Sequence, residues 1–141
     1  VEGDRIVSPR QAPRALQSLG RRLAVLLVEV PLPAFGFPVP HQHAEMAAFL
    51  WTVYDRALLY PEENPEMDEV RLARLVERLE AHLDGLRVAG EEGLRISEER
   101  FAEYPEAGEL FVTRMLVVGA PERVAALDLA KVRAYLAAHL P

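Results

Sequence analysis

The chain lacks cysteine altogether. That absence excludes disulfide bonds, thiolate nucleophiles and zinc sites built from sulfur ligands. It fits a protein of the reducing cytoplasm, which is the location we expect.

The sequence also lacks a long apolar run. Its longest run covers residues 23–28, whereas a membrane span needs about 20 apolar residues, so no membrane contact is expected. Arg21 and Arg22 precede this run, as in a signal peptide, but Glu29 interrupts its end and no small-residue cleavage site follows. We therefore expect no signal peptide.

Signatures of known chemistry are missing too. The serines Ser8, Ser18 and Ser97 do not lie in a Gly-x-Ser-x-Gly elbow, and neither a phosphate loop nor a Gly-x-Gly-x-x-Gly motif occurs. The net charge of −6 and the pI of about 5.3 would repel phosphate backbones, so we expect no nucleic-acid partner.

What the sequence has is enough apolar material for one folded domain. Half of its 141 residues are apolar, and a chain of this length can bury a real core. The chain begins with Val1 rather than methionine, so whether it belongs to a longer protein stays open.

The clearest pattern lies in residues 68–90. Apolar residues recur there at spacings of three and four, with charged residues between them, which is the period of a helix with one buried stripe. The stripe consists of Leu72, Leu75, Val76, Leu79, Leu83 and Leu86. Together with the helical patterns described next, this helix predicts an all-α fold.

Similar patterns predict four more helices, separated by Pro61, Pro105 and a corner at Gly119–Pro121. The helix from His41 or His43 to Tyr60 is apolar on most sides, so it should lie centrally among the others. The predicted helices cover residues 43–60, 68–89, 91–104, 107–118 and 122–139. One contiguous core is expected from Phe49, Leu50, Trp51, Tyr54, Leu75, Leu79, Leu83 and Leu86.

Residues 1–40 form a separate N-terminal segment ahead of a helical domain at 41–141. Residues 15–30 favour a helix, although their β-branched content also permits a buried strand. Residues 31–40 contain four prolines and predict an extended connector. Its two phenylalanines favour packing on the body over recognition by a partner domain.

Three blocks of the helical domain resemble a known family. They are HAEMAAFLW at 43–51, continued by Asp55-Arg56-Ala57, the longer LVERLEAHLDGLRVAG at 75–90, and EAGELF at 106–111. Together they are similar to the N-terminal region of an uncharacterised group of bacterial HEAT-repeat proteins, whose genes tend to lie near type VI secretion components. The block at 75–90 is the specific part.

The resemblance covers roughly residues 41–125 and implies antiparallel helical hairpins that start a HEAT-like α-solenoid. It implies no known activity and no cofactor. The chain departs from the family at Leu94, where a bulky aromatic residue is expected.

His41, His43 and Glu45 are the candidate metal ligands. Imidazole and carboxylate groups suit zinc or iron. If the segment is helical, His41 and Glu45 share a face and His43 points away; if it is extended, all three share a side. A zinc site needs three or four protein ligands, and only His82 and His139 remain as distant donors. We therefore predict no bound metal.

Two further polar groups are interpreted as structural. Helix geometry turns His82 toward the buried stripe and Glu80 and Asp84 mostly elsewhere, so His82 should pack and hydrogen-bond to a neighbouring helix. Asp55 and Arg56 lie on the polar stripe of a mostly apolar helix, which predicts an interhelical salt bridge.

The leading hypothesis for function is a non-enzymatic helical module or scaffold for protein–protein interaction, secretion-associated by analogy. The alternative is a metal-dependent or nucleic-acid-modifying enzyme on a helical-repeat fold. A protein partner is expected, and its identity and the oligomeric state are left open by the sequence.

Overall fold

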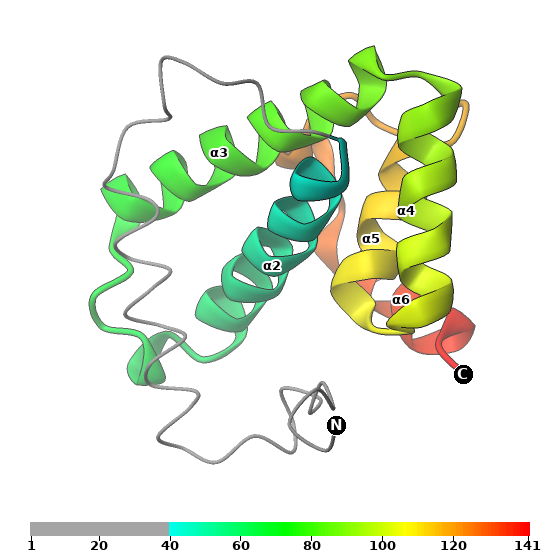
Figure 1. Ribbon diagram of the computed structural model, residues 1–141. Coiled ribbons are helices and arrows are strands. Elements are labelled where there is room, and N and C mark those ends of the chain that lie inside the picture. The colour runs from blue at the N-terminus through cyan, green and yellow to red at the C-terminus, as the bar shows by residue number, and fades with distance from the viewer. Residues whose placement is uncertain (1–39) are drawn as a thin grey trace, which may run out of the picture.

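The computed structural model describes residues 40–141, and every regular element in this range is a helix (Figure 1). The elements are α2 (Pro40–Leu59), η2 (Pro61–Glu63), α3 (Glu69–Val88), α4 (Glu91–Glu103), α5 (Ala107–Leu116), η3 (Val124–Ala126) and α6 (Leu129–His139), where η marks a 3₁₀ helix. The all-α prediction is confirmed for this part of the chain. The predicted helix at 15–30 and the proline-rich connector lie outside the described residues, except for Pro40.

Local chemistry explains where the two longest helices begin and end. Pro40 is the first residue of α2, a position where its missing N–H costs nothing, and Pro61 follows its end. Asp68 caps α3 by accepting a hydrogen bond from the backbone N–H of Arg71 at 2.9 Å. Gly90, at a φ of 61°, lets the chain turn directly into α4.

α2 is the central helix, as its apolar surface predicted. It packs against α3, α4 and α5, and α3 returns along it at an angle (Figure 1). Six of the eight predicted core residues are buried, while Phe49 and Tyr54 are half-buried and pack against that core. The indole of Trp51 stacks on Phe111 of α5, with ring centroids 3.9 Å apart. The predicted contiguous core of α2 and α3 residues is therefore confirmed.

α4 and α5 form an antiparallel hairpin beside α2 (Figure 1). Arg100 of α4 pairs with Glu109 of α5 at 3.5 Å, and the Thr113 hydroxyl donates to the Ser97 carbonyl at 3.4 Å. α5 approaches α2 closely because Gly108 has no side chain. A Cβ there would lie 2.8 Å from the Thr52 hydroxyl oxygen.

The predicted helix at 122–139 is wrong at its start. Only Val124–Ala126 forms a 3₁₀ turn, and α6 begins at Leu129. Two interactions set this break. The Val124 N–H donates to the Glu80 carboxylate on α3, and Asp128 caps α6 by accepting from the Lys131 N–H at 3.3 Å. None of the described helices is long and apolar enough to cross a membrane.

Candidate functional site

The three candidate metal ligands are not brought together. α2 is helical from Pro40 onward, so the helical alternative holds, and His43 turns toward α3 while His41 and Glu45 remain exposed. Within residues 40–141, no group of three histidine or acidic side chains could hold a metal ion.

His43 instead joins His82 of α3. Their Nδ1 atoms lie 2.9 Å apart, and the ring planes are tilted by 59°. His82 is 6% exposed, so its predicted packing role and its hydrogen bond to a neighbouring helix are confirmed. Gly85 makes the room, because a Cβ there would lie 2.5 Å from His43 Nε2.

Burial shifts both imidazoles of this pair toward the neutral form. Burial lowers the pKa of His82 to about 4, with smaller contributions in the same direction from His43 and from the Arg78 guanidinium. Burial also lowers the pKa of His43. In a neutral pair one Nδ1 carries the hydrogen and donates, and the other accepts.

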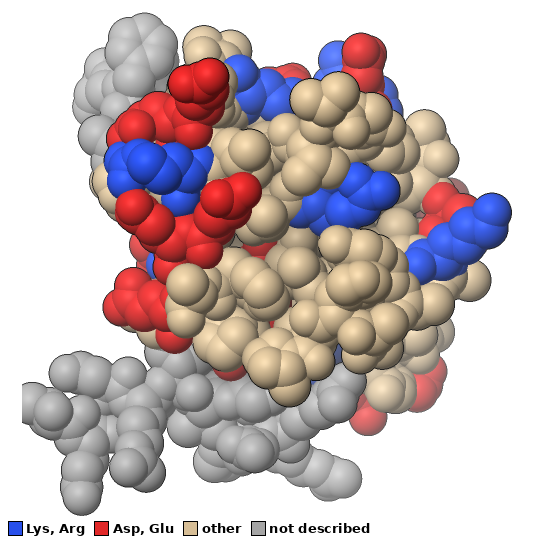
Figure 2. Space-filling view, turned by 90° about the vertical axis from the view of Figure 1, so that its right-hand side faces the viewer, with Lys and Arg blue, Asp and Glu red and all other residues tan. Residues whose placement is uncertain are grey.

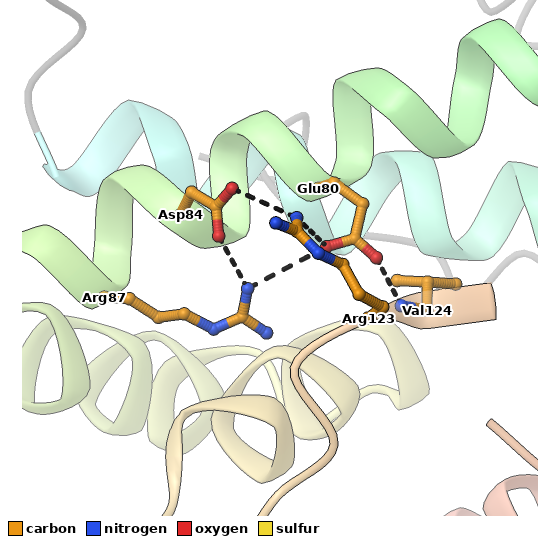
Figure 3. A network of polar contacts seen from close by, with 5 residues as sticks. All are labelled: Glu80, Asp84, Arg87, Arg123 and Val124. Atoms are coloured by element: carbon orange, nitrogen blue, oxygen red, sulfur yellow. Dashed lines mark hydrogen bonds and ion pairs between the residues drawn. The ribbon is translucent and has the colours of Figure 1, made fainter. Parts of the chain in front are cut away.

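A second polar cluster fixes the segment that leads into α6 (Figure 3). Glu80 is only 9% exposed; its carboxylate accepts the Val124 N–H and lies 3.5 Å from the Arg123 guanidinium. Arg87 approaches Asp84 at 2.8 Å and Glu80 at 3.8 Å. Glu80 lies on the side of Asp84, as predicted, but the turn at Val124 covers it. The chain before α6 is thereby tied to α3.

The predicted interhelical salt bridge is confirmed. Asp55 of α2 accepts a hydrogen bond from Arg133 Nε of α6 at 2.7 Å. Arg56 pairs with Glu63 of η2 at 3.7 Å. α6 is thus held at two places: by the Glu80 cluster on the segment before it and by Arg133 near its middle.

α6 presents an unusual surface away from the body. Only Leu136 of this helix is fully buried. The exposed residues on its opposite side are four alanines and one lysine, where polar side chains are usual. We call this set the outer α6 face: Ala130, Lys131, Ala134, Ala137 and Ala138.

Lys131 and Arg114 place positive charges at this face, and the capping Asp128 places a negative charge at its start. α6 contains no carboxylate between Leu129 and His139, and the exposed Arg114 of α5 lies over the Tyr135 ring, 5.4 Å from its centre. Figure 2 shows acidic side chains gathered along one edge of this side of the molecule, beside a broad uncharged area that basic side chains interrupt.

Sequence reasoning missed this face, although a signal was present. Periodicity placed Leu129, Val132, Leu136 and Leu140 in register. Half of the residues between them are alanine, which fits a helix but does not indicate which side is exposed to water. The missing carboxylates in LAKVRAYLAAH were the usable clue.

No family model, no curated protein and no solved structure matches the chain.

Proposed function

We propose that the chain is a non-enzymatic helical interaction module that binds a partner protein through the outer α6 face. One observation carries the proposal: a solvent-facing helical surface of Ala130, Ala134, Ala137 and Ala138 with no carboxylate in the helix. The exposed face of a surface helix normally carries charged and polar side chains, and this face has only Lys131.

The occupant we propose is an amphipathic helix of the partner, with carboxylates along one flank. Alanines let two helix backbones approach closely and offer grooves to the partner's larger side chains. Lys131 and Arg114 supply the charge that selects acidic flanks, because electrostatic complementarity sets orientation and speeds encounter.

The resemblance of residues 41–125 gives this proposal its setting. We propose that α2–α6 start a HEAT-like α-solenoid, in which each helical layer is covered by the next, and that the protein acts as a cytoplasmic adaptor beside type VI secretion components. The short α4–α5 hairpin and the flanking helix α6 on α5 are compatible with this layout.

A zero-length crosslink tests the contact directly. Lys131 is the only lysine in the chain, so a carbodiimide should join its amine to a carboxylate of the bound partner in cells that naturally make the protein. Lys131→Arg is the matched control, because it keeps the charge and removes the reactive amine. The crosslink that maps to residue 131 should disappear in this variant, whereas crosslinks from carboxylates of this chain to amines of the partner remain.

The captured partner must then be purified and its affinity measured. Ala134→Glu should weaken binding at least tenfold, about 1.4 kcal/mol, since it places a carboxylate against acidic flanks. Ala102→Glu, at an exposed alanine on α4, should leave the affinity unchanged. Equal affinities of the wild type and Ala134→Glu, or a captured complex without a crosslink at Lys131, would overturn the proposal.

A further inference from the structure

The His43–His82 pair joins the two helices that build most of the core. His43 lies in the first turn of α2, and His82 lies in the second half of α3. Their 2.9 Å contact needs exactly one hydrogen between the two Nδ1 atoms. A first added proton can still be accommodated, since a protonated imidazole donates to a neutral one. A second cannot, because two N–H groups would then point at each other.

The surroundings offer this second proton no compensation. On α3, Arg78 lies one turn before His82 and disfavours a charge there. On α2, His41 and Glu45 are exposed beside the pair, and Glu92 at the start of α4 interacts with His41. Among the described residues, no carboxylate is in hydrogen-bond contact with either ring of the pair. Because Gly85 has no side chain, the His43 ring fits against α3 in the intact pair without a steric clash.

We propose that the His43–His82 pair is an acid-sensitive clasp between α2 and α3. With at most one proton added, it holds the start of α2 against α3. When both rings are protonated, their repulsion, and that from Arg78, releases the first turns of α2 while the Trp51–Phe111 stack keeps the rest of α2 in place. The device is independent of the outer α6 face, which lies on another helix.

The sign of the pH effect follows from proton binding. An unfolded or released His82 regains its ordinary pKa of 6.5, whereas the packed ring has a pKa of about 4. Between these values the released state binds more protons, so acid favours release. The clasp is therefore fully effective above about pH 6.5 and is lost progressively toward pH 4.

Hydrogen exchange of the full chain tests the clasp. The protection of amides at the start of α2 and the end of α3 is measured at about pH 7 and about pH 4.5, with α5 amides as the internal reference. In the wild type, protection should fall at least tenfold more in the clasp segments than in α5. His43→Gln keeps a hydrogen-bonding side chain but removes one of the two titrating rings, so its difference should be clearly smaller than that of the wild type, and the part that remains belongs to the buried His82.

His41→Gln is the matched control, because it removes an exposed histidine two residues away on the same helix. It should behave as the wild type does. Identical pH responses of His43→Gln and His41→Gln would overturn the clasp, and so would an equal loss of protection in α5.

A second measurement keeps the proposal testable if His43→Gln does not fold. Imidazole NMR titration of the wild type should show two coupled steps for His43 and His82, the second well below the ordinary histidine range. In Gly85→Ala the new methyl group displaces the His43 ring, so the coupling should vanish. Two independent titrations at ordinary values in the wild type would refute the clasp.

Discussion

α4 and α6 flank the same helix, α5, yet their outer surfaces are opposites. α4 carries five glutamates in thirteen residues, and its exposed Arg95 is bracketed by Glu92 and Glu99. α6 carries no carboxylate and shows alanine where α4 shows glutamate. Two helices of similar length that pack on α5 therefore differ in the side chains that they expose to water. The charged groups on the outer side of α4 are satisfied by water and by local ion pairs. For this reason we place the partner on α6.

The largest effect we expect comes from the core against which α4 and α5 pack. Leu79 of α3 is fully buried, and Leu79→Ala should lower the free energy of unfolding by about 2–5 kcal/mol, through lost burial and the cavity left behind. Urea unfolding followed by circular dichroism measures this. Val70→Ala, on an exposed side chain of the same helix, is the control; if both variants unfold at the same urea concentration, α3 does not support the core as described.

A substitution with a smaller effect should act on α6 and leave α4 unchanged. Glu80→Gln keeps an oxygen for the Val124 N–H but removes the charge that faces Arg87 and Arg123. We expect a loss of about 1–3 kcal/mol, felt by η3 and α6 and not by α4. Hydrogen exchange resolved by helix checks this. Faster exchange spread evenly over α4 and α6 would contradict the assigned role of Glu80.

The smallest effect on stability, and the sharpest test of the comparison, comes from placing one glutamate on the outer surface of each helix. Ala134→Glu and Ala102→Glu both replace an exposed helical alanine, so each should change the free energy of unfolding by no more than about 0.5 kcal/mol. Thermal melts of the two variants measure it. A large loss in Ala134→Glu alone would mean that Ala134 packs within the molecule and that the outer α6 face is part of its own core.

The sequence predicted those features whose causes are local. Proline at 61 and the three-four spacing of leucines locate α2 and α3 to within a few residues. The roles of Asp55 and His82 followed from the same periodicity, since a polar group on a buried stripe needs a partner. Those partners, Arg133 and His43, were not predictable, because helix periodicity does not say which helices meet.

The errors have non-local causes. α6 begins five residues after Val124 because the Val124 N–H is satisfied by Glu80, 44 residues earlier in the chain. The same contact buries a carboxylate that helix geometry had placed on the wet side. The outer α6 face was overlooked because alanine favours a helix in any environment, so it gives no sign of which side water should reach.

The stacking of Trp51 on Phe111 also decides what an optical experiment can see. The chain has a single tryptophan, and its indole on α2 stacks on Phe111 of α5. Its emission therefore reports chiefly on the α2–α5 junction, whereas far-ultraviolet ellipticity counts every helix. If α6 leaves the body while α2 and α5 stay together, the change in ellipticity will precede the change in emission. Superposition of the two curves would instead show one cooperative transition that includes α6.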